Sequence, residues 1–365
     1  MSHALQLAER GLYSTDPNPR VGCVLVKEGV VVGTGWHHVA GGPHAEIHAL
    51  NNAGAKARGA TAFVTLEPCC HHGKTPPCTD ALIAAGVARV VAAMSDPNPQ
   101  VSGKGLQQLR DAGIEVDSGL LESQALALNS GFVQRMRSGR PWVRCKLALS
   151  LDGKTALANG QSQWITGEAA RLDVQRFRAR SSAIVTGIGT VLADDPSLTV
   201  RIDTGLHPVR QPLRVVLDSR LRITPSAKIL AQPGRTLIFT TVGDTQRVAA
   251  LQLDNVQVVT LPELRLDVIL TRLAQEQCNE VWVEAGAILS GALLRDGWVD
   301  ELVLYVAPKL LGDSARGLFQ LPALSALADA VSLEITDVRM VGKDLRIIAK
   351  MGTRASSPPK EVLTY

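Results

Sequence analysis

The sequence predicts a two-domain protein of the α/β class. Its 365 residues are more than one hydrophobic core usually organises, so two domains are expected. Apolar runs of strand length alternate with segments of helical periodicity, which indicates sheets covered by helices. One such series ends at Gly139-Arg140-Pro141 and another begins. We therefore expect domains over 1–142 and 143–352.

The elements of the first half predict a largely parallel or mixed sheet. An amphipathic helix is expected over about 2–13. Further helices are expected from about His44, over about 79–85, over 105–113 and within 125–139. The expected strands are "VGCVLV" (21–26), "VVVGTGW" (30–36), "TAFVTL" (61–66), "ARVVAAM" (88–94) and "GIEV" (113–116).

The second half predicts another α/β sheet, with an antiparallel edge. Two runs around a Gly-Lys-Asp turn within 332–350 alternate in polarity, as the strands of a hairpin do. The Pro-rich segment over 353–365 is expected to be a mobile tail. Helices are expected over 168–181 and 268–277. The expected strands are 182–187, 213–218, 236–240, 256–260 and 280–286, after the run that begins at 141.

Composition narrows the classes of function. The chain is 45% hydrophobic and 20% charged, with a formal charge of +4. Aromatic residues make up 4%, which argues against a protein that stacks on nucleic-acid bases. The N-terminus has no secretory-signal pattern, and no uncharged apolar run reaches membrane-spanning length. We expect a cytoplasmic protein with neither a membrane nor a nucleic-acid partner, whose clustered cysteines bind metal rather than form disulfides.

The stretch "EPCCHHGKTPPC" (67–78) contains three of the six cysteines. Upstream, "PHAEIHAL" supplies His44 and Glu46, and the two stretches together hold the residue types of a zinc-dependent nucleobase deaminase. One imidazole and two thiolates hold zinc and leave a fourth position for water, whose pKa the metal lowers. A carboxylate that is not a ligand then carries the proton.

Other readings of the stretch remain open on the residues alone. Eight residues separate Cys69 from Cys78, whereas the general deaminase pattern has two. A closed structural zinc loop of Cys69, Cys78 and His71 or His72 is one alternative, although it leaves Glu46 without a role. Pairing His44 with His48 is another, but helical metalloproteases place the glutamate directly after the first histidine. On a regular helix His44 and Glu46 would also point about 200° apart.

Three stretches of the first half resemble a known family. "PNPRVGCVLV", "GWHHVAGGPHAE" and "TLEPCCHHGKTPPC" are similar to the deaminase half of the bifunctional riboflavin-biosynthesis deaminase–reductases, in which a long insertion between the cysteines is normal. The resemblance implies a cytidine-deaminase-like three-layer domain with one zinc ion per chain, Glu46 as proton shuttle and Cys70 as a non-ligand. The implied zinc ligands are His44, Cys69 and Cys78. The implied substrate contacts are Asn18, His37, His71 and Lys74, although the sequence does not distinguish His37 from His38.

The second half carries weaker signals on its residues alone. "GIGT" (187–190) is a lone G-x-G that a tight βα turn also explains. "VEAG" (283–286) ends a strand where a helix starts, and backbone N–H groups there could hold a phosphate.

The same family accounts for the second half. "KLALSLDGK", "SQWITG", "TVLADDPSLTVR" and "VEAG" resemble its reductase half, which implies a dihydrofolate-reductase-like fold and NADPH. Lys146 is the implied catalytic residue. The implied cofactor contacts are Ala148, Trp164, Thr190, Asp194, Ser219 and Gly286. The implied substrate contacts are Ser162, Arg178, Leu198, Arg201 and Glu284, with the two arginines as forked donors to a phosphate.

The resemblance implies a bifunctional enzyme of riboflavin synthesis. Its first domain would hydrolytically deaminate 2,5-diamino-6-(5-phosphoribosylamino)pyrimidin-4-one, and its second would use NADPH to reduce the ribosyl side chain to ribityl. A homodimer or higher homo-oligomer is expected. One rival is a nucleoside or nucleic-acid deaminase with an unrelated second domain. Another is a zinc-stapled structural or interaction protein, in which Glu46 would be dispensable.

Overall fold

The computed structural model describes residues 1–71, 76–99, 101–203, 210–251 and 253–352. The predicted substrate contact Lys74 and the predicted tail over 353–365 lie outside these residues. The chain passes from one compact unit to a second between Arg140 and Pro141. Among the described residues, no helix is both long and apolar enough to cross a membrane.

The first unit is built on a mixed sheet of five strands in the order β2-β1-β3-β4-β5. β1 is antiparallel to both β2 and β3, while β3, β4 and β5 run parallel. The strands are β1 (Gly22–Lys27), β2 (Val30–Trp36), β3 (Thr61–Val64), β4 (Arg89–Ala92) and β5 (Glu115–Ser118).

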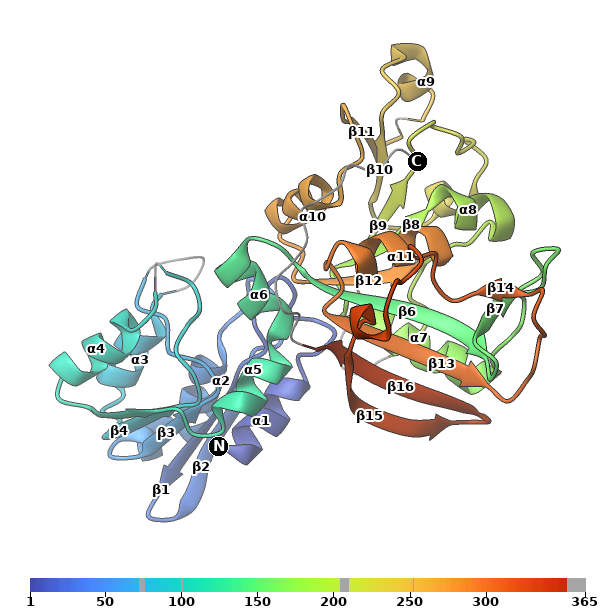
Figure 1. Ribbon diagram of the computed structural model, residues 1–365. Helices are drawn as coiled ribbons and strands as arrows, with labels where there is room; N and C mark the ends of the chain where they lie inside the picture. The colour runs from blue at the N-terminus through green and yellow to red at the C-terminus, as the bar shows by residue number, and fades with distance from the viewer. Residues whose placement is uncertain (72–75, 100, 204–209, 252, 353–365) are drawn as a thin grey trace. The chain divides into compact units, whose positions relative to one another are not determined.

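Helices cover both faces of this sheet, which gives three layers (Figure 1). On one face, α2, α3 and α4 bury residues such as Ala49, Leu82 and Leu109 against the strands. On the other face, α1, α5 and α6 contribute residues such as Leu5 and Val133. The helices are α1 (Ser2–Glu9), α2 (Ala45–Ala53), η1 (Gly54–Ala57), α3 (Cys78–Ala84), α4 (Lys104–Asp111), α5 (Glu122–Leu128) and α6 (Ser130–Ser138).

Glycines on β2 let helix α2 lie directly on the sheet. A Cβ at Gly35 would stand 2.4 Å from the Ala45 carbonyl oxygen and 2.5 Å from the Ala49 nitrogen. A Cβ at Gly33 would stand 2.4 Å from the Ala49 carbonyl oxygen. Because these atoms belong to the helix backbone, any larger residue would push α2, and with it His44, away from the sheet.

The second unit is built on a sheet of nine strands in the order β11-β10-β9-β8-β12-β6-β13-β16-β15. In this order, the strands β11, β10, β9, β8, β12, β6 and β13 all run parallel to one another. The hairpin β15–β16 forms the antiparallel edge. The strands are β6 (Trp142–Ser150), β8 (Ala183–Gly187), β9 (Leu213–Leu217), β10 (Thr236–Thr240), β11 (Val256–Thr260), β12 (Glu280–Glu284), β13 (Glu301–Ala307), β15 (Leu333–Val341) and β16 (Asp344–Met351), with β7 (Lys154–Ala156) paired to β14 (Arg316–Gly317).

This sheet also has a helical layer on each face (Figure 1). On one face, α10 and α11 bury residues such as Leu270 and Leu293. On the other, α7 and α8 bury residues such as Val174 and Val191. The helices are α7 (Glu168–Arg180), α8 (Ile188–Asp194), η2 (Lys228–Ala231), α9 (Thr245–Ala249), α10 (Leu266–Gln275), α11 (Ala287–Arg295) and η3 (Leu327–Asp329).

The parallel strands β6, β8, β9 and β12 end at one edge of the sheet. The strand order changes direction here, because β8 to β11 extend to one side and β12 returns to lie between β8 and β6. In open parallel sheets, ligands bind at the carboxyl edge near such a change. This edge is therefore the place to look for a site in the second unit.

Most predicted helices and strands are present, but several elements differ from the prediction. The elements β7, β14, α8 and α9 are absent from it. β13 is absent from the prediction, although it lies between β6 and β16. The first helix ends at Glu9 rather than near residue 13, and continues as hydrogen-bonded turns. The segment within 125–139 forms α6 and the end of α5, divided at Asn129. Helix α3 begins at Cys78 rather than Thr79.

Candidate active sites

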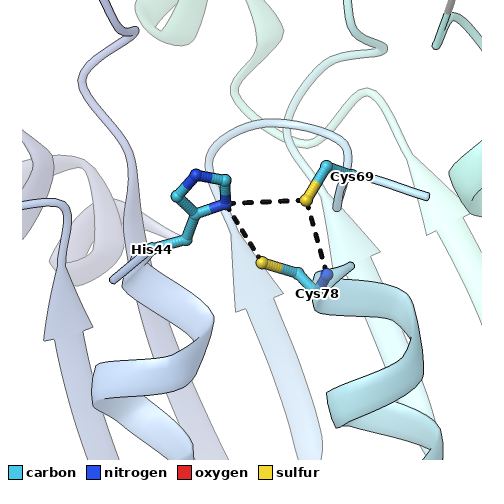
Figure 2. A group of neighbouring side chains, drawn as sticks. All are labelled: His44, Cys69 and Cys78. Atoms are coloured by element: carbon cyan, nitrogen blue, oxygen red, sulfur yellow. Dashed lines mark hydrogen bonds between the residues drawn. The ribbon is translucent and has the colours of Figure 1, made fainter. Parts of the chain in front are cut away.

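His44, Cys69 and Cys78 come together at one end of the first sheet (Figure 2). His44 precedes α2, Cys69 follows β3, and Cys78 is the first residue of α3. His44 Nδ1 lies 3.2 Å from Cys78 Sγ and 3.5 Å from Cys69 Sγ. The backbone N–H of Cys78 donates to Cys69 Sγ at 3.4 Å.

These three atoms match the donor set of a tetrahedral zinc ion. Zinc–nitrogen and zinc–sulfur bonds of about 2.1 and 2.3 Å at tetrahedral angles place nitrogen and sulfur about 3.6 Å apart. The two measured nitrogen–sulfur distances, 3.2 and 3.5 Å, are close to this value. One imidazole and two thiols also leave the fourth position open, as catalytic zinc sites do.

The two thiols of this cluster differ in acidity. Cys69 accepts hydrogen bonds from the Cys78 thiol and backbone and lies beside His44, and these contacts lower its pKa to about 4. The Cys78 thiol donates that hydrogen bond to Cys69 and is buried, and both effects raise the pKa of Cys78. The surrounding protein groups therefore favour the thiolate form of Cys69 only. A bound cation would also favour loss of the proton from Cys78.

Glu46 is buried beside this cluster. The residue is 3% exposed, and its Oε2 has no hydrogen-bond partner among the described residues. Burial raises the pKa of the carboxyl to about 7. His44 is not part of the helix but its N-cap, with extended backbone angles, so the 200° offset of a regular helix does not separate it from Glu46. A carboxyl of this kind is suited to taking up and releasing a proton near neutral pH.

The structure separates His37 from His38. The His37 ring lies edge-on to His44, with 5.4 Å between ring centres. The Pro43 carbonyl accepts from His37 Nδ1 at 3.0 Å, so Nε2 is left to accept from Asn18 Nδ2, also at 3.0 Å. Burial lowers the pKa of His37 to about 4, which keeps the ring neutral. The predicted contacts Asn18 and His37 are therefore adjacent.

The remaining histidines favour the deaminase reading over its alternatives. His38 stacks on His48 with ring centres 4.1 Å apart, so His48 packs against an aromatic ring and is not part of the cluster. His71 is exposed and also outside the cluster, and His72 lies outside the described residues. Among the described residues, neither the closed loop nor the His44–His48 pair forms.

Two acidic residues beside the cluster are absent from the prediction. Glu67 is 3% exposed, and its carboxylate accepts four backbone hydrogen bonds. Asp96 is close enough to Cys69 and His71 to interact electrostatically with both, and burial raises its pKa to about 6. In the sequence each of these residues is simply an acidic residue before a proline, which does not indicate a functional site. The groups that surround these carboxylates come from distant parts of the chain.

In the second unit, Lys146, Arg178 and Glu284 form a charged cluster in which Arg178 is buried and the other two are half-buried. Lys146 on β6 and Glu284 on β12 are direct partners in the parallel pairing. Arg178 on α7 donates to both Glu284 oxygens, from Nε at 2.5 Å and from NH2 at 2.9 Å. Trp282 Nε1 donates to the same carboxylate at 2.8 Å. Three predicted site residues are thus brought together.

The charges of this cluster shift one another's ionisation. Burial alone would raise the pKa of the Glu284 carboxyl, but Arg178, Lys146 and a hydrogen bond from Trp282 together lower it to about 2. Burial lowers the pKa of the Lys146 ammonium, which Glu284 partly offsets. The cluster therefore places an ionised carboxylate and an ammonium with a reduced pKa at the carboxyl edge of the sheet.

The Arg178 fork binds a carboxylate of the protein itself. The family resemblance implies that this fork contacts a phosphate of the substrate. In the structure the side chain is buried, its Nε and NH2 groups donate to Glu284, and NH1 donates to the Thr199 carbonyl at 3.0 Å. The fork is used within the protein because Glu284, far away in sequence, lies directly opposite.

The segment over 198–201 is held by side chains rather than by a sheet. The Arg201 backbone N–H donates to Gln175 Oε1 at 2.9 Å. Gln211 both accepts from the Val200 N–H at 2.9 Å and donates to its carbonyl at 3.0 Å. Leu198 is buried with φ of 48°, a conformation uncommon for leucine. These contacts fix the backbone from which the Arg201 side chain extends.

The predicted cofactor residues lie along the carboxyl edge of the sheet. Gly286 follows β12 as the N-cap of α11, and a Cβ placed there would meet no atom within 4 Å. The start of α11 thus faces open space, as a phosphate-bearing cofactor requires. Ala148 lies on β6, Ser219 follows β9, and Thr190 and Asp194 lie on α8.

The loop over 157–167 reaches the same region. Gln163 donates to Asp194 at 2.8 Å, which ties the loop to α8. The neighbouring Trp164 is exposed, with the Arg171 guanidinium 4.8 Å from its ring centre. Ser162 in this loop is half-buried. An exposed indole here offers a flat apolar surface to a ring-bearing ligand.

Comparisons with known proteins agree in both halves. Residues 1–94 match the family model described as the cytidine and deoxycytidylate deaminase zinc-binding region. Residues 141–347 match the RibD C-terminal domain. The riboflavin biosynthesis protein RibD of Escherichia coli (strain K12) is 55% identical over 358 residues, which cover 94% of this chain and 96% of that protein.

Solved structures give the same result. The structure of Acinetobacter baumannii RibD, form 1, is 48% identical, with a TM-score of 0.91 over 96% of this chain and 98% of that one. A diaminohydroxyphosphoribosylaminopyrimidine deaminase/5-amino-6-(5-phosphoribosylamino)uracil reductase from Thermotoga maritima is 35% identical, with a TM-score of 0.87 over 96% and 97% of the two chains. These matches confirm the predicted fold class, the two enzyme halves and the two cofactors, zinc and NADPH. The chain belongs to the RibD family of bifunctional riboflavin-biosynthesis deaminase–reductases.

Proposed function

We propose that this chain deaminates 2,5-diamino-6-(5-phosphoribosylamino)pyrimidin-4-one and then reduces the ribosyl side chain of the product to ribityl. The observation that supports this most strongly is the presence of two separate reactive clusters, His44/Cys69/Cys78 with Glu46 and Lys146/Arg178/Glu284, in one chain. The Thermotoga maritima relative, which is similar over nearly the full chain, has a name that states the same two activities.

For the first reaction, we assign the proton transfers to Glu46. His44, Cys69 and Cys78 would hold the zinc ion, which when bound would supply a Lewis acid that activates water at neutral pH. The Glu46 carboxylate accepts one proton from the attacking water and delivers it to the ring nitrogen. It then takes the second proton from the hydroxyl formed on the ring and delivers it to the amino group, which leaves as ammonia. Overall, water replaces the 2-amino group with an oxygen, and ammonia leaves. Burial keeps the Glu46 pKa near the pH at which both transfers occur.

Two of the contacts assigned to the first substrate, His37 and Asn18, lie beside this cluster. Neutral His37 and the Asn18 amide, already hydrogen-bonded to each other, offer polar groups to the pyrimidine edge. We assign further contacts to His71, which is exposed, and to Lys74 as a partner for the phosphate.

For the second reaction, we assign Lys146 and Glu284 to the pyrimidine and Arg201 to the phosphate. NADPH supplies the hydride. The hydride adds to ribose C1′ after the ring opens to an imine, and a proton goes to the nitrogen. The paired charges of Lys146 and Glu284 orient the substrate, and Arg178 keeps Glu284 ionised. Ser162 and Leu198 complete the substrate contacts, and the cofactor contacts are Ala148, Trp164, Thr190, Asp194, Ser219 and Gly286.

The organisation of the chain follows from these assignments. We propose a deaminase domain over 1–142 and a reductase domain over 143–352. The passage between compact units at Arg140/Pro141 and the family match over 141–347 support the boundary. We further propose one zinc ion per chain, a cytoplasmic location, a homodimer or higher homo-oligomer, and no nucleic-acid partner.

A coupled assay tests the proposal. Purified zinc-loaded protein is given the phosphoribosylated diaminopyrimidine, with NADPH withheld and then added. Ammonia release without NADPH, followed by NADPH oxidation, supports both steps in this order. Ammonia release from cytidine or adenosine alone, with NADPH untouched, would contradict the assigned substrate and favour a nucleoside deaminase with an unrelated second domain.

A further inference from the structure

The carboxylate of Glu67 lies where four backbone N–H groups converge. Oε2 accepts from Asp96 at 3.0 Å and from Gly103 at 2.9 Å. Oε1 accepts from Gly105 at 2.9 Å and from Leu106 at 3.3 Å. Three of these donors belong to the N-terminal end of α4, which favours a negative charge. Glu67 thus binds the start of α4 to the chain two residues before Cys69.

The start of α4 is also in close contact with the same segment. A Cβ at Gly105 would stand 2.0 Å from the Pro68 carbonyl oxygen. Because only a glycine allows this approach, the first turn of α4 lies directly against the backbone between Glu67 and Cys69.

One turn further along, α4 contacts the first turn of α3, next to Cys78. Gln108 accepts a hydrogen bond from Thr79 Oγ1 at 3.0 Å and donates to Asp80 Oδ1 at 2.7 Å. The Thr79 N–H donates to the Cys69 carbonyl at 3.2 Å. That carbonyl also lies 3.2 Å from Thr79 Oγ1, whose single hydrogen is shared between it and Gln108. Helix α4 therefore contacts the residue that joins the Cys69 backbone to the start of α3, next to Cys78.

We propose that Glu67 is a positioning residue of the zinc centre, which acts through α4 to set the separation of Cys69 and Cys78. This inference rests on the proposed assignment of zinc to His44, Cys69 and Cys78. Glu67 holds one end of α4 and Gln108 connects the next turn to Thr79, so the helix braces both cysteines from outside the ligand set. Groups outside the ligand set commonly change metal affinity by about 10- to 100-fold.

A carboxylate is the side chain that this position requires. Each of its oxygens accepts two hydrogen bonds, so all four N–H groups are satisfied. In a Glu67→Gln variant of the same size, the amide NH2 would face two N–H donors. At least two of these donors would then be left unsatisfied in a buried place.

The test compares four variants of the full chain, three with single substitutions and one that combines Glu67→Gln with Gln108→Ala. Glu67→Gln removes the charge, and Gln108→Ala removes the contact one turn on. Gln107→Ala is the matched control, because Gln107 is exposed on the same helix and its amide donates to Asp111. Each variant is measured for zinc affinity by chelator competition, for the absorption spectrum of the Co²⁺-substituted protein, and for thermal unfolding.

We expect Glu67→Gln to lower zinc affinity about 10- to 100-fold and to shift the Co²⁺ bands, because the ligand geometry relaxes. Gln108→Ala should shift both in the same direction by less, and Gln107→Ala should match the wild type. The effects of Glu67→Gln and Gln108→Ala should not add in the double variant, since both act through α4.

Two results would overturn the inference. One is a Glu67→Gln protein that unfolds at a lower temperature but keeps wild-type zinc affinity and Co²⁺ bands, which would leave Glu67 a purely structural role. If Glu67→Gln does not fold, an unchanged zinc affinity and Co²⁺ spectrum in Gln108→Ala overturns it equally. A wild-type Co²⁺ spectrum without thiolate bands would instead refute the zinc assignment, and this inference with it.

Discussion

Glu46 has a carboxyl oxygen that no described group satisfies, in a place where burial usually demands a partner. Structural buried carboxylates are satisfied, as Glu67 is by four N–H groups. The contrast between the two glutamates separates a carboxyl that is free to exchange a proton from one that is fixed by its hydrogen bonds.

Replacing Glu46 by Gln should lower deaminase turnover by at least about 10²- to 10⁴-fold, because the amide keeps the shape but carries no proton. Zinc content and reductase activity should be unchanged. Ammonia release and metal analysis measure both. Glu9→Gln, on the exposed side of α1, is the control and should behave as wild type. Retained turnover in Glu46→Gln would remove the proton-transfer assignment.

Replacing Lys146 by Ala should lower reductase kcat/KM by about 10²- to 10³-fold, since it removes a preorganised charge from the site. Deamination should be spared, because Lys146 belongs to the second compact unit. NADPH oxidation with the deaminated aminouracil is the readout, and Lys350→Ala, exposed on β16, is the control. Loss of both activities would indicate misfolding instead.

Glu284 should make the free energy of unfolding of the second unit depend on pH in the acidic range. Its pKa falls from 4.5 to about 2 on folding, so its contribution is present above about pH 4.5 and is lost as the pH falls toward 2. Calorimetry of the transition that NADPH shifts should therefore show a loss of stability over this range. A Glu284→Gln protein should lack that part of the slope. Equal slopes in both proteins would show that Glu284 is not held ionised by Arg178 and Lys146.

At the scale of elements, helix starts determine where functional groups stand. His44 is the N-cap of α2, Cys78 begins α3, and Gly286 is the N-cap of α11. Residues at these places leave the regular helical path or lie at its first turn, so their side chains and N–H groups face outward from the helix end. The start of α11 is the one that can be tested without disturbing a metal ligand.

Gly286→Val should weaken NADPH binding about 5- to 100-fold, because the side chain would fill space that we assign to the cofactor. The fold should tolerate the change, since a Cβ there meets no atom within 4 Å and φ is −74°. NADPH titration and thermal unfolding separate the two effects. Gly243→Val, also in open space, is the control. Unchanged NADPH affinity would place the cofactor elsewhere.

At the scale of the whole molecule, two cores support two chemistries. The first unit buries apolar residues on both faces of its sheet, among them Leu25, Leu82 and Val133. This core does not depend on the cysteine cluster for its packing. The second unit has its own pair of cores. Loss of activity at one site should therefore leave the activity of the other site unchanged.

Removing zinc with a chelator should abolish deamination and leave reduction of the deaminated substrate unchanged. The first unit should keep its secondary structure, because its apolar core supplies the stability. Circular dichroism and the two activity assays measure this outcome, and added zinc should restore deamination. Unfolding of the first unit on chelation would favour a zinc-stapled structural domain over a catalytic one.

The sequence by itself determined the fold class, most strands and helices, and the residue types of the zinc site. These follow from local periodicity and from rare residues at short spacing, both of which are carried by neighbouring residues. The family resemblance added the pairing of His44 with cysteines 25 and 34 residues away, which lie together in the structure.

Only the tertiary structure decided which groups each side chain contacts. It assigned the Arg178 fork to Glu284, 106 residues away, and the Glu67 carboxylate to N–H groups up to 39 residues away. It also showed β13 between two other strands and distinguished His37 from His38 by what each ring contacts. The physical reason is common to these cases: a side chain's partner is set by strand order and helix packing, which bring distant segments together, and no local pattern encodes that distance.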